Sequence, residues 1–322
     1  MKEKGSCGAE HKPSQRAVVF GAPSHPDTTQ LMPNVQFTML NSMADRDFER
    51  ALDRHVEWAL EHLDLKGGIF GKDVVGLSEP EANQARQLID NRGLSVYCMS
   101  TTLFDEFVEA GEDTFRADHL AKLDRAIEVA RVLQPHFVRL LAAKTRRRAE
   151  LKDSVAYLAK EHTWLIELYR EAIGRLVDAG QRVTVENECH DCIMSTPEEI
   201  HAFFDLTDGG DNLSFTWDVQ NLWQMGTFPS LDVYEDLKDL ISYYHVKGGR
   251  AEIEGGPLKW RSSLEDASWP VEEITSRVIA DGIIPVICLN GSHGECKEGY
   301  DYESVTERDL TYMKHIAWVV SS

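Results

Sequence analysis

The stretch ISYYHVKGG, residues 241–249, decides the fold, because a strand-like apolar run ends there in ionisable side chains. Side chains alternate between the two faces of a strand, so His245 and Lys247 are expected to point the same way. The pair Gly248-Gly249 then turns the chain away. A face that carries an imidazole and an ammonium group at a strand end suits a metal ligand or a proton carrier with a positive charge beside it.

Strand-like and helix-like segments alternate along the chain on both sides of this stretch. The expected strands cover 34–40, 63–67, 94–100, 136–142, 182–188, 213–221, 241–249 and 283–291. The expected helices cover 43–62, 78–93, 116–134, 145–179, 196–207, 230–240, 270–281 and 302–319. Such alternation is typical of parallel strands joined by helical crossovers. It predicts an α/β protein with a single (β/α)₈ TIM barrel over residues 34–322.

An open doubly wound sheet is the alternative architecture. It gains no support from the sequence, because no G-x-G-x-x-G motif follows any of the expected strands. Residues 1–33 are rich in glycine, proline and serine and show no periodicity, so we expect an extended N-terminal arm there.

Composition restricts the partners of the chain. The formal net charge of −20 argues against nucleic acid and against an anionic membrane surface, because both attract clustered lysine and arginine. No apolar run is long enough to span a membrane, and the N-terminus lacks the apolar core of a signal peptide, so a cytoplasmic location is expected. Six scattered cysteines require no disulfide framework in a chain of 322 residues.

Polar side chains stand at the ends of four consecutive expected strands, where a TIM barrel carries its active site. These residues are Glu186, Asp218, His245 and Asn290. Two carboxylates and an imidazole suit one divalent cation such as Mn²⁺, Mg²⁺, Co²⁺ or Zn²⁺, and the amide oxygen of Asn290 can complete the ligand set. A cation would also relieve the repulsion between carboxylates crowded at one rim.

The motifs VEN, FTWDVQN, YYHVKG and VICLN, in this order, resemble the last four strands of the xylose isomerase-like TIM barrels. HLDLKG at the second strand is similar too, and the resemblance covers about residues 34–320. This superfamily holds sugar isomerases and epimerases, inosose dehydratases and repair enzymes of the endonuclease IV type. The resemblance implies a divalent metal held by Glu186, Asp218 and His245, and a sugar-like substrate.

The sequence departs from the family pattern at two positions. Asn290 stands where family members usually have a glutamate, and Asn221 stands where many have a histidine. Epimerisation by a pair of glutamates therefore lacks one partner. His293 or Glu295, in the turn after the last strand, can substitute for the missing base.

We expect chemistry that begins with proton abstraction next to a carbonyl, with a metal polarising that carbonyl. The expected catalytic residues are Glu186, Lys247 and His293, and the expected substrate contacts are Lys66, Glu188, Trp217 and Asn290. Three of these residues have a specific structural alternative: a salt bridge to a rim carboxylate for Lys66 and Lys247, and core packing for Trp217. Arg139, inside the fourth strand, is expected to pair with a carboxylate in the barrel. The motif Cys189-x-x-Cys192 is a weak signal for a redox pair or half of a zinc site.

The leading functional prediction is a metal-dependent isomerase or epimerase of a small sugar or polyol. A lyase on the same scaffold is the first alternative, because dehydration or elimination begins with the same proton abstraction. A non-catalytic sugar-binding barrel is a further alternative, and the net charge counts against an endonuclease. A homo-oligomer is compatible with the sequence.

Overall fold

The computed structural model describes residues 35–322. The expected N-terminal arm, residues 1–33, lies outside the described residues, so the division into arm and barrel stays a prediction.

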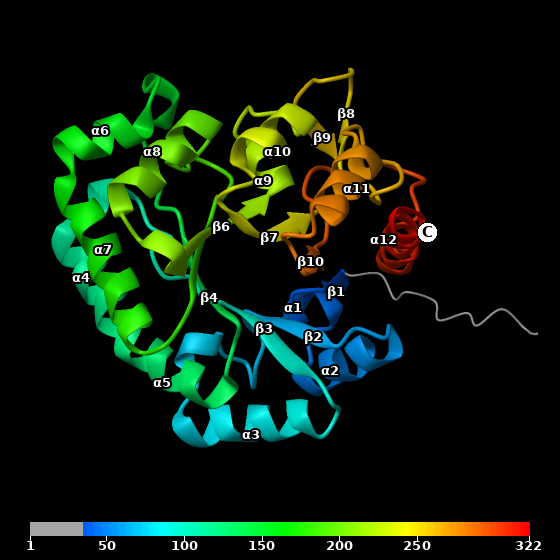
Figure 1. The fold of residues 1–322 in the computed structure, drawn as a ribbon, viewed down its shortest axis with the longest axis horizontal. Coiled ribbons are helices and arrows are strands. Elements are labelled where there is room, and N and C mark those ends of the chain that lie inside the picture. The colour runs from blue at the N-terminus through cyan, green and yellow to red at the C-terminus, as the bar shows by residue number, and fades with distance from the viewer. Residues whose placement is uncertain (1–34) are drawn as a thin grey trace, which may run out of the picture. The chain divides into compact units, whose positions relative to one another are not determined.

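Eight parallel strands form the inner wall of the fold, which Figure 1 shows as a nearly closed ring. Their order in the sheet is β1-β10-β7-β6-β5-β4-β3-β2, and a parallel bridge between Leu40 and Asp64 brings the two ends of the sheet together. The predicted (β/α)₈ TIM barrel is thereby confirmed. The strands are β1 (Gln36–Thr38), β2 (His62–Leu65), β3 (Ser95–Ser100), β4 (Phe137–Leu141), β5 (Val183–Glu186), β6 (Leu213–Asp218), β7 (Ile241–Val246) and β10 (Val286–Leu289).

Helices surround the ring on its outer side (Figure 1). Some of them begin with a side-chain cap: the Asp47 side chain accepts a hydrogen bond at the start of α2, and the Thr196 side chain does so at α8. The helices are α1 (Asn41–Ala44), α2 (Phe48–Glu57), α3 (Glu79–Asp90), α4 (Glu112–Asp118), α5 (Leu123–Leu133), α6 (Ser154–Glu161), α7 (Thr163–Asp178), α8 (Pro197–Thr207), α9 (Val219–Gln224), α10 (Leu231–Leu237), α11 (Val271–Asp281) and α12 (Val305–Ser321).

Several predicted boundaries were wrong. The helices expected over 43–62 and 116–134 are each interrupted, and the one expected over 145–179 begins only at Ser154 and breaks at His162. The backbone of His162 is not helical, and its ring lies 2.8 Å from the hydroxyl of Tyr157. The strand expected over 213–221 ends at Asp218, because the Asp218 side chain caps the next helix, α9.

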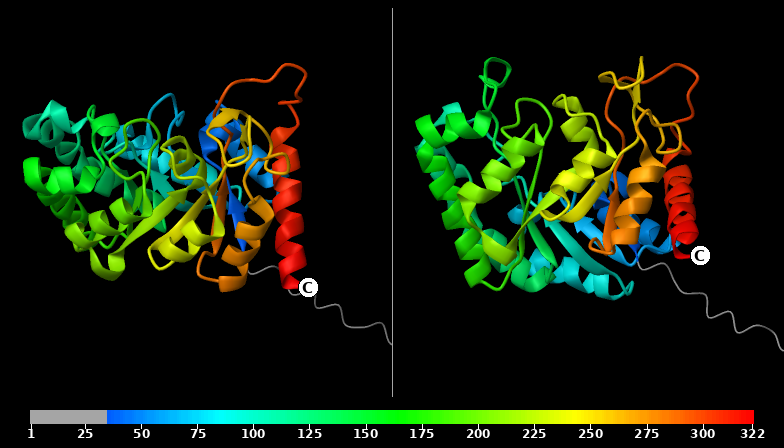
Figure 2. Two further views of the ribbon diagram at one scale, coloured as in Figure 1. Left: turned by 90° about the horizontal axis from the view of Figure 1, so that it is seen from above. Right: turned by 45° about the horizontal axis from the view of Figure 1, so that its top comes forward.

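A short antiparallel hairpin, which the sequence did not predict, follows β7. It consists of β8 (Arg250–Ala251) and β9 (Leu258–Trp260). The segment after β10 runs beside it, since a parallel bridge joins Trp260 to Glu295. Figure 2 shows both segments projecting from the same end of the barrel, next to the end of β7.

The alternation of side chains along the strands sorts them between barrel interior and helix layer. Trp217 pairs in register with Tyr244, and both belong to the large apolar core outside the sheet. Asp218 pairs with His245, one step further along, and these two side chains face the interior. Below them the interior is filled by Tyr97, Cys98, Phe137, Tyr243, Val286 and Cys288. Of the helices in residues 35–322, none has the length and apolar character needed to cross a membrane.

Candidate active site

Three side chains from neighbouring strands meet inside the barrel at the C-terminal ends of the strands. Glu186 ends β5, Asp218 ends β6 and His245 lies near the end of β7, and all three are buried. Nδ1 of His245 lies 3.1 Å from Oε1 of Glu186 and 3.9 Å from Oδ2 of Asp218. One potential ligand atom from each residue lies within 4.8 Å of the other two. Asp218 pairs directly with His245, whereas Glu186 pairs with Thr216, two residues earlier on β6, so the Glu186 side chain meets the other two from one inward position further down.

Two buried cations accompany these carboxylates. Arg139 on β4 forms an ion pair with Glu186 and donates a 3.0 Å hydrogen bond to the carbonyl of Thr101. The ammonium nitrogen of Lys247 lies 2.6 Å from Oδ2 of Asp218. The expected buried pair of Arg139 is therefore present, and Lys247 makes the salt bridge that was its structural alternative.

The charges of the cluster depend on one another. Burial acts to raise the pKa of Glu186, but the guanidinium of Arg139 and the ring of His245 hold it well below its usual range. Burial acts to lower the pKa of His245, and Glu186 outweighs this effect and raises it well above its usual range. The pKa of Lys247 is raised as well, because Asp218 outweighs the effect of burial. Without a bound cation, these interactions therefore favour the charged form of each of the three groups.

The donor set fits a divalent cation. Oδ2 of Asp218 is buried, and among residues 35–322 it has no hydrogen-bond partner of acceptable geometry, although the ammonium nitrogen of Lys247 lies 2.6 Å away. Two carboxylates and one imidazole match the preferences of Mn²⁺ and Zn²⁺. Arg139 and Lys247 already balance part of the negative charge, so a cation would share the carboxylates with them.

Asn290 lies at the same cluster, directly after β10. Its Nδ2 is 3.4 Å from Nδ1 of His245, and its Oδ1 accepts a 3.4 Å hydrogen bond from the backbone of Leu40. An amide cannot remove a proton from carbon at neutral pH. Asn290 thus lies beside the ring of His245, and it does not supply the base that a glutamate would.

Glu188 and His293 lie at the rim, where both are half-buried. Burial and the neighbouring Glu186 raise the pKa of Glu188. Burial and the ammonium group of Lys247 lower the pKa of His293 to about 4. His293 is therefore a neutral imidazole at pH 7, and its backbone is fixed by a 2.7 Å hydrogen bond to the side chain of Gln220.

Lys66 and Trp217 were also predicted to contact a substrate. Lys66 follows β2, is half-buried, and acts on the carboxyl group of Glu188 through its charge. Trp217 is fully buried, and its ring stacks on Tyr244 and Tyr234 with centroid distances of 5.3 and 6.1 Å. This position between sheet and helices matches the packing alternative, and Trp217 lies outside the cluster.

Sequence reasoning missed Asp64, which reaches the cluster from β2. It is fully buried, and its Oδ2 lies 3.5 Å from Nε2 of His245. The sequence did carry a signal for Asp64. It is an acidic residue between two leucines in HLDL, and the period of two puts it on the same face of the strand as His62 and Lys66.

The Cys189-x-x-Cys192 motif forms no second site. Cys192 is buried, and burial raises the pKa of its thiol to about 12 and that of Cys189 to about 11. Neither thiol belongs to a metal-ligand cluster within residues 35–322. Both groups are therefore protonated and weakly nucleophilic at neutral pH.

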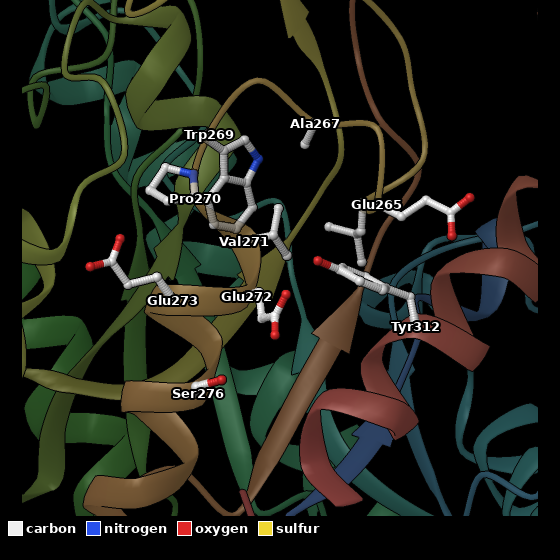
Figure 3. A pocket seen from close by; sticks show the side chains of 10 residues that line it. Glu265, Ala267, Trp269, Pro270, Val271, Glu272, Glu273, Ser276 and Tyr312 are labelled. Atoms are coloured by element: carbon white, nitrogen blue, oxygen red, sulfur yellow. The ribbon is translucent and has the colours of Figure 1, made fainter. Parts of the chain in front are cut away.

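A separate cleft of about 540 Å³ lies on the outer side of the barrel, between α11 and α12. Figure 3 shows Glu272 and Ser276 on α11 facing Tyr312 on α12 across it. None of the predicted site residues lines this cleft. It is thus distinct from the cluster at the strand ends.

The fold and the strand-end cluster define a (β/α)₈ barrel with a titratable site in the usual place for an enzyme of this architecture. The xylose isomerase-like TIM barrel family matches residues 34–308, and the chain belongs to this family. No curated protein sequence matches the chain.

Solved structures with the same fold include proteins of different activities. A xylose isomerase-like TIM barrel protein from Mycobacterium smegmatis, in complex with magnesium, is 16% identical with a TM-score of 0.65, and the match covers 89% of this chain and 97% of that one. A 3-keto-D-glucoside 4-epimerase from E. coli is 11% identical, with a TM-score of 0.64 and coverage of 88% and 98%. A probable 3-DHS dehydratase from Bacillus anthracis is 15% identical, with a TM-score of 0.60 and coverage of 89% and 99%.

Proposed function

We propose that this protein is a divalent-metal-dependent isomerase or epimerase of a small sugar or polyol, and that its reaction begins with removal of a proton next to a carbonyl. The observation that carries the proposal is the meeting of Glu186, Asp218 and His245 inside the barrel, with the ammonium group of Lys247 beside them. Membership of the xylose isomerase-like family and the similar fold of an epimerase support it.

Glu186, Asp218 and His245 would hold the cation, with Asn290 as a further ligand or substrate contact. When bound, the metal supplies a Lewis acid that polarises the substrate carbonyl. Asp218 and Asn221 hold the Lys247 ammonium group at 2.6 and 3.0 Å, where it can stabilise an oxyanion that develops on the substrate. The carboxylates thus orient the cationic groups before the reaction begins.

The proton is removed and returned at the rim in this proposal. His293 is neutral at pH 7, so its ring can accept a proton from carbon, and Glu188 is a carboxyl group with a raised pKa that can bind a substrate hydroxyl or return a proton. Lys66, whose charge acts on Glu188, would contact the same end of the substrate.

A lyase acting on the same substrate class is the second candidate, and Asn290 is the observation that favours it. Two-base epimerisation needs a proton donor on the second side of the carbon, and an amide in the position of the usual glutamate cannot act as one. An enolate that is not reprotonated can instead expel a hydroxyl or alkoxy group from the next carbon.

Incubation with keto-sugars and keto-polyols in D₂O, followed by NMR, tests the proposal and separates the two candidates. Deuterium at the carbon next to the carbonyl of a rearranged product is the result expected of an isomerase or epimerase. An unsaturated ketone, detected by its ultraviolet absorbance, identifies a lyase. Binding of a sugar with no deuterium incorporation and no elimination, in protein loaded with Mn²⁺, would contradict both and indicate a binding protein.

A further inference from the structure

Asp64 is a buried carboxylate in the barrel interior, and with His245 and Cys288 it forms a second group of potential metal-ligand atoms. It lies beside Nε2 of His245, whereas Glu186 lies beside Nδ1. Its Oδ2 accepts a 3.0 Å hydrogen bond from the hydroxyl of Tyr243 and lies 3.8 Å from the thiol of Cys288. Its Oδ1 is buried and has no hydrogen-bond partner among residues 35–322. A fully buried carboxylate is costly, so its place beside an imidazole calls for an explanation.

The ring of His245 lies between two carboxylates. Nδ1 is 3.1 Å from Oε1 of Glu186, and Nε2 is 3.5 Å from Oδ2 of Asp64. An imidazole that binds a metal offers the lone pair of one nitrogen and carries its proton on the other. The nitrogen that keeps the proton is set by the stronger hydrogen-bond acceptor beside it.

We propose that Asp64 is a positioning residue, which accepts the Nε2–H of His245 and so directs the Nδ1 lone pair to a divalent cation shared with Glu186 and Asp218. This inference rests on the proposed function, because it presupposes the cation.

The surroundings of the two carboxylates favour this assignment. Glu186 is already paired with the guanidinium of Arg139, which weakens it as an acceptor. Asp64 has no salt bridge within the described part of the chain other than the contact with His245. Cys288 competes only weakly, because its thiol is directed as a donor at Asp64 and Asn290, and thiol sulfur is a weak acceptor. Carboxylates that hold the second nitrogen of a metal-binding histidine commonly contribute about 10- to 100-fold to metal affinity.

The experiment compares Zn²⁺ affinity, measured by calorimetry, in the wild-type protein and in Asp64→Leu, Asp64→Asn and Tyr243→Phe. Tyr243→Phe is the matched control, because it removes the other hydrogen bond to Oδ2 while it keeps the carboxylate. Circular dichroism checks folding, and Asp64→Asn retains the shape of the side chain if Asp64→Leu does not fold. Nitrogen-15 NMR of the zinc-bound wild type, with His245→Gln for assignment, identifies the nitrogen that carries the proton.

We expect affinity to fall by about 10- to 100-fold in Asp64→Leu, to fall less in Asp64→Asn, and to stay unchanged in Tyr243→Phe. The NMR spectrum should show a protonated Nε2 and a metal-bound Nδ1. Unchanged affinity in the folded Asp64 variants, or zinc bound at Nε2 together with Cys288, would overturn the inference and leave the proposed function standing. Absence of Zn²⁺ and Mn²⁺ binding in the wild type would overturn both.

Discussion

Replacement of Arg139 by methionine is the most informative change to the cluster. Arg139 and Glu186 are 1% and 3% exposed, and in the variant the carboxylate stays buried without its guanidinium partner. The 3.0 Å hydrogen bond to the carbonyl of Thr101 is lost as well. Removing one partner of a buried pair usually costs about 3 to 5 kcal/mol, so we expect the free energy of unfolding to fall by that amount.

The same variant tests whether a cation can take over from the guanidinium. A ligand at 100 times its Kd stabilises the folded state by about 2.7 kcal/mol. Glu186 loses its guanidinium partner in Arg139→Met and keeps only the contact with His245, so Mn²⁺ should bind more tightly there and should raise stability by more than it does in the wild type. The double variant Arg139→Met/Glu186→Gln, which removes both charges of this buried pair, should be more stable than the single variant in the absence of metal.

Urea unfolding with and without Mn²⁺ measures these differences. The matched control is Arg86→Met, which breaks the solvent-accessible 2.8 Å pair with Asp90 and a 3.0 Å hydrogen bond to the carbonyl of Leu133, and should cost about 1 to 2 kcal/mol. A loss of stability in Arg139→Met no larger than that in Arg86→Met would refute the reasoning about burial. Equal stabilisation of wild type and Arg139→Met by Mn²⁺ would refute the idea that the cation shares Glu186 with Arg139.

Three further predictions concern single side chains. Lys247→Met should lower kcat by about 10²- to 10³-fold, since it removes the ammonium group beside the developing oxyanion; a kcat equal to that of the wild type would exclude this role. His293→Gln should lower kcat by about 10²- to 10⁴-fold. It should also abolish the fall in activity near pH 4, where the wild-type ring gains its proton. His315→Gln, on the exposed side of α12, should change neither kcat nor the pH profile. Burial raises the pKa of Asp309 from 3.8 to about 7, so the folded state keeps a proton that the unfolded state loses. The free energy of unfolding should therefore fall by at most about 4 kcal/mol as pH rises from 4 to 7. Asp309→Asn should flatten this dependence in urea titrations at several pH values, and an unchanged slope would contradict the assignment.

The barrel and much of its site could be predicted because both depend on local patterns. Alternation of apolar runs with amphipathic segments indicates crossovers, and the carboxyl ends of parallel strands meet at one rim. The meeting of Glu186, Asp218 and His245 follows from these two facts. The side of the sheet that each residue faces follows from the period of two, which also places Trp217 opposite to Asp218.

Contacts across the barrel could not be predicted in this way. Asp64 reaches Tyr243 and Cys288 over 179 and 224 residues of sequence, and no local pattern links them. The break at His162 depends on the conformation of one residue inside a segment that is otherwise suited to a helix. The end of β6 was misjudged because Asp218 was interpreted only as a ligand, although its side chain also caps α9.

The central claim is that Glu186, Asp218 and His245 bind one divalent cation, and the metal content of the purified protein tests it most directly. Elemental mass spectrometry after loading with Mn²⁺ or Zn²⁺ and desalting should find about one equivalent per chain in the wild type and in His315→Gln. The same measurement should find none in His245→Ala and Asp218→Ala. Absence of metal from the wild type, or an undiminished content in the two site variants, would contradict the account.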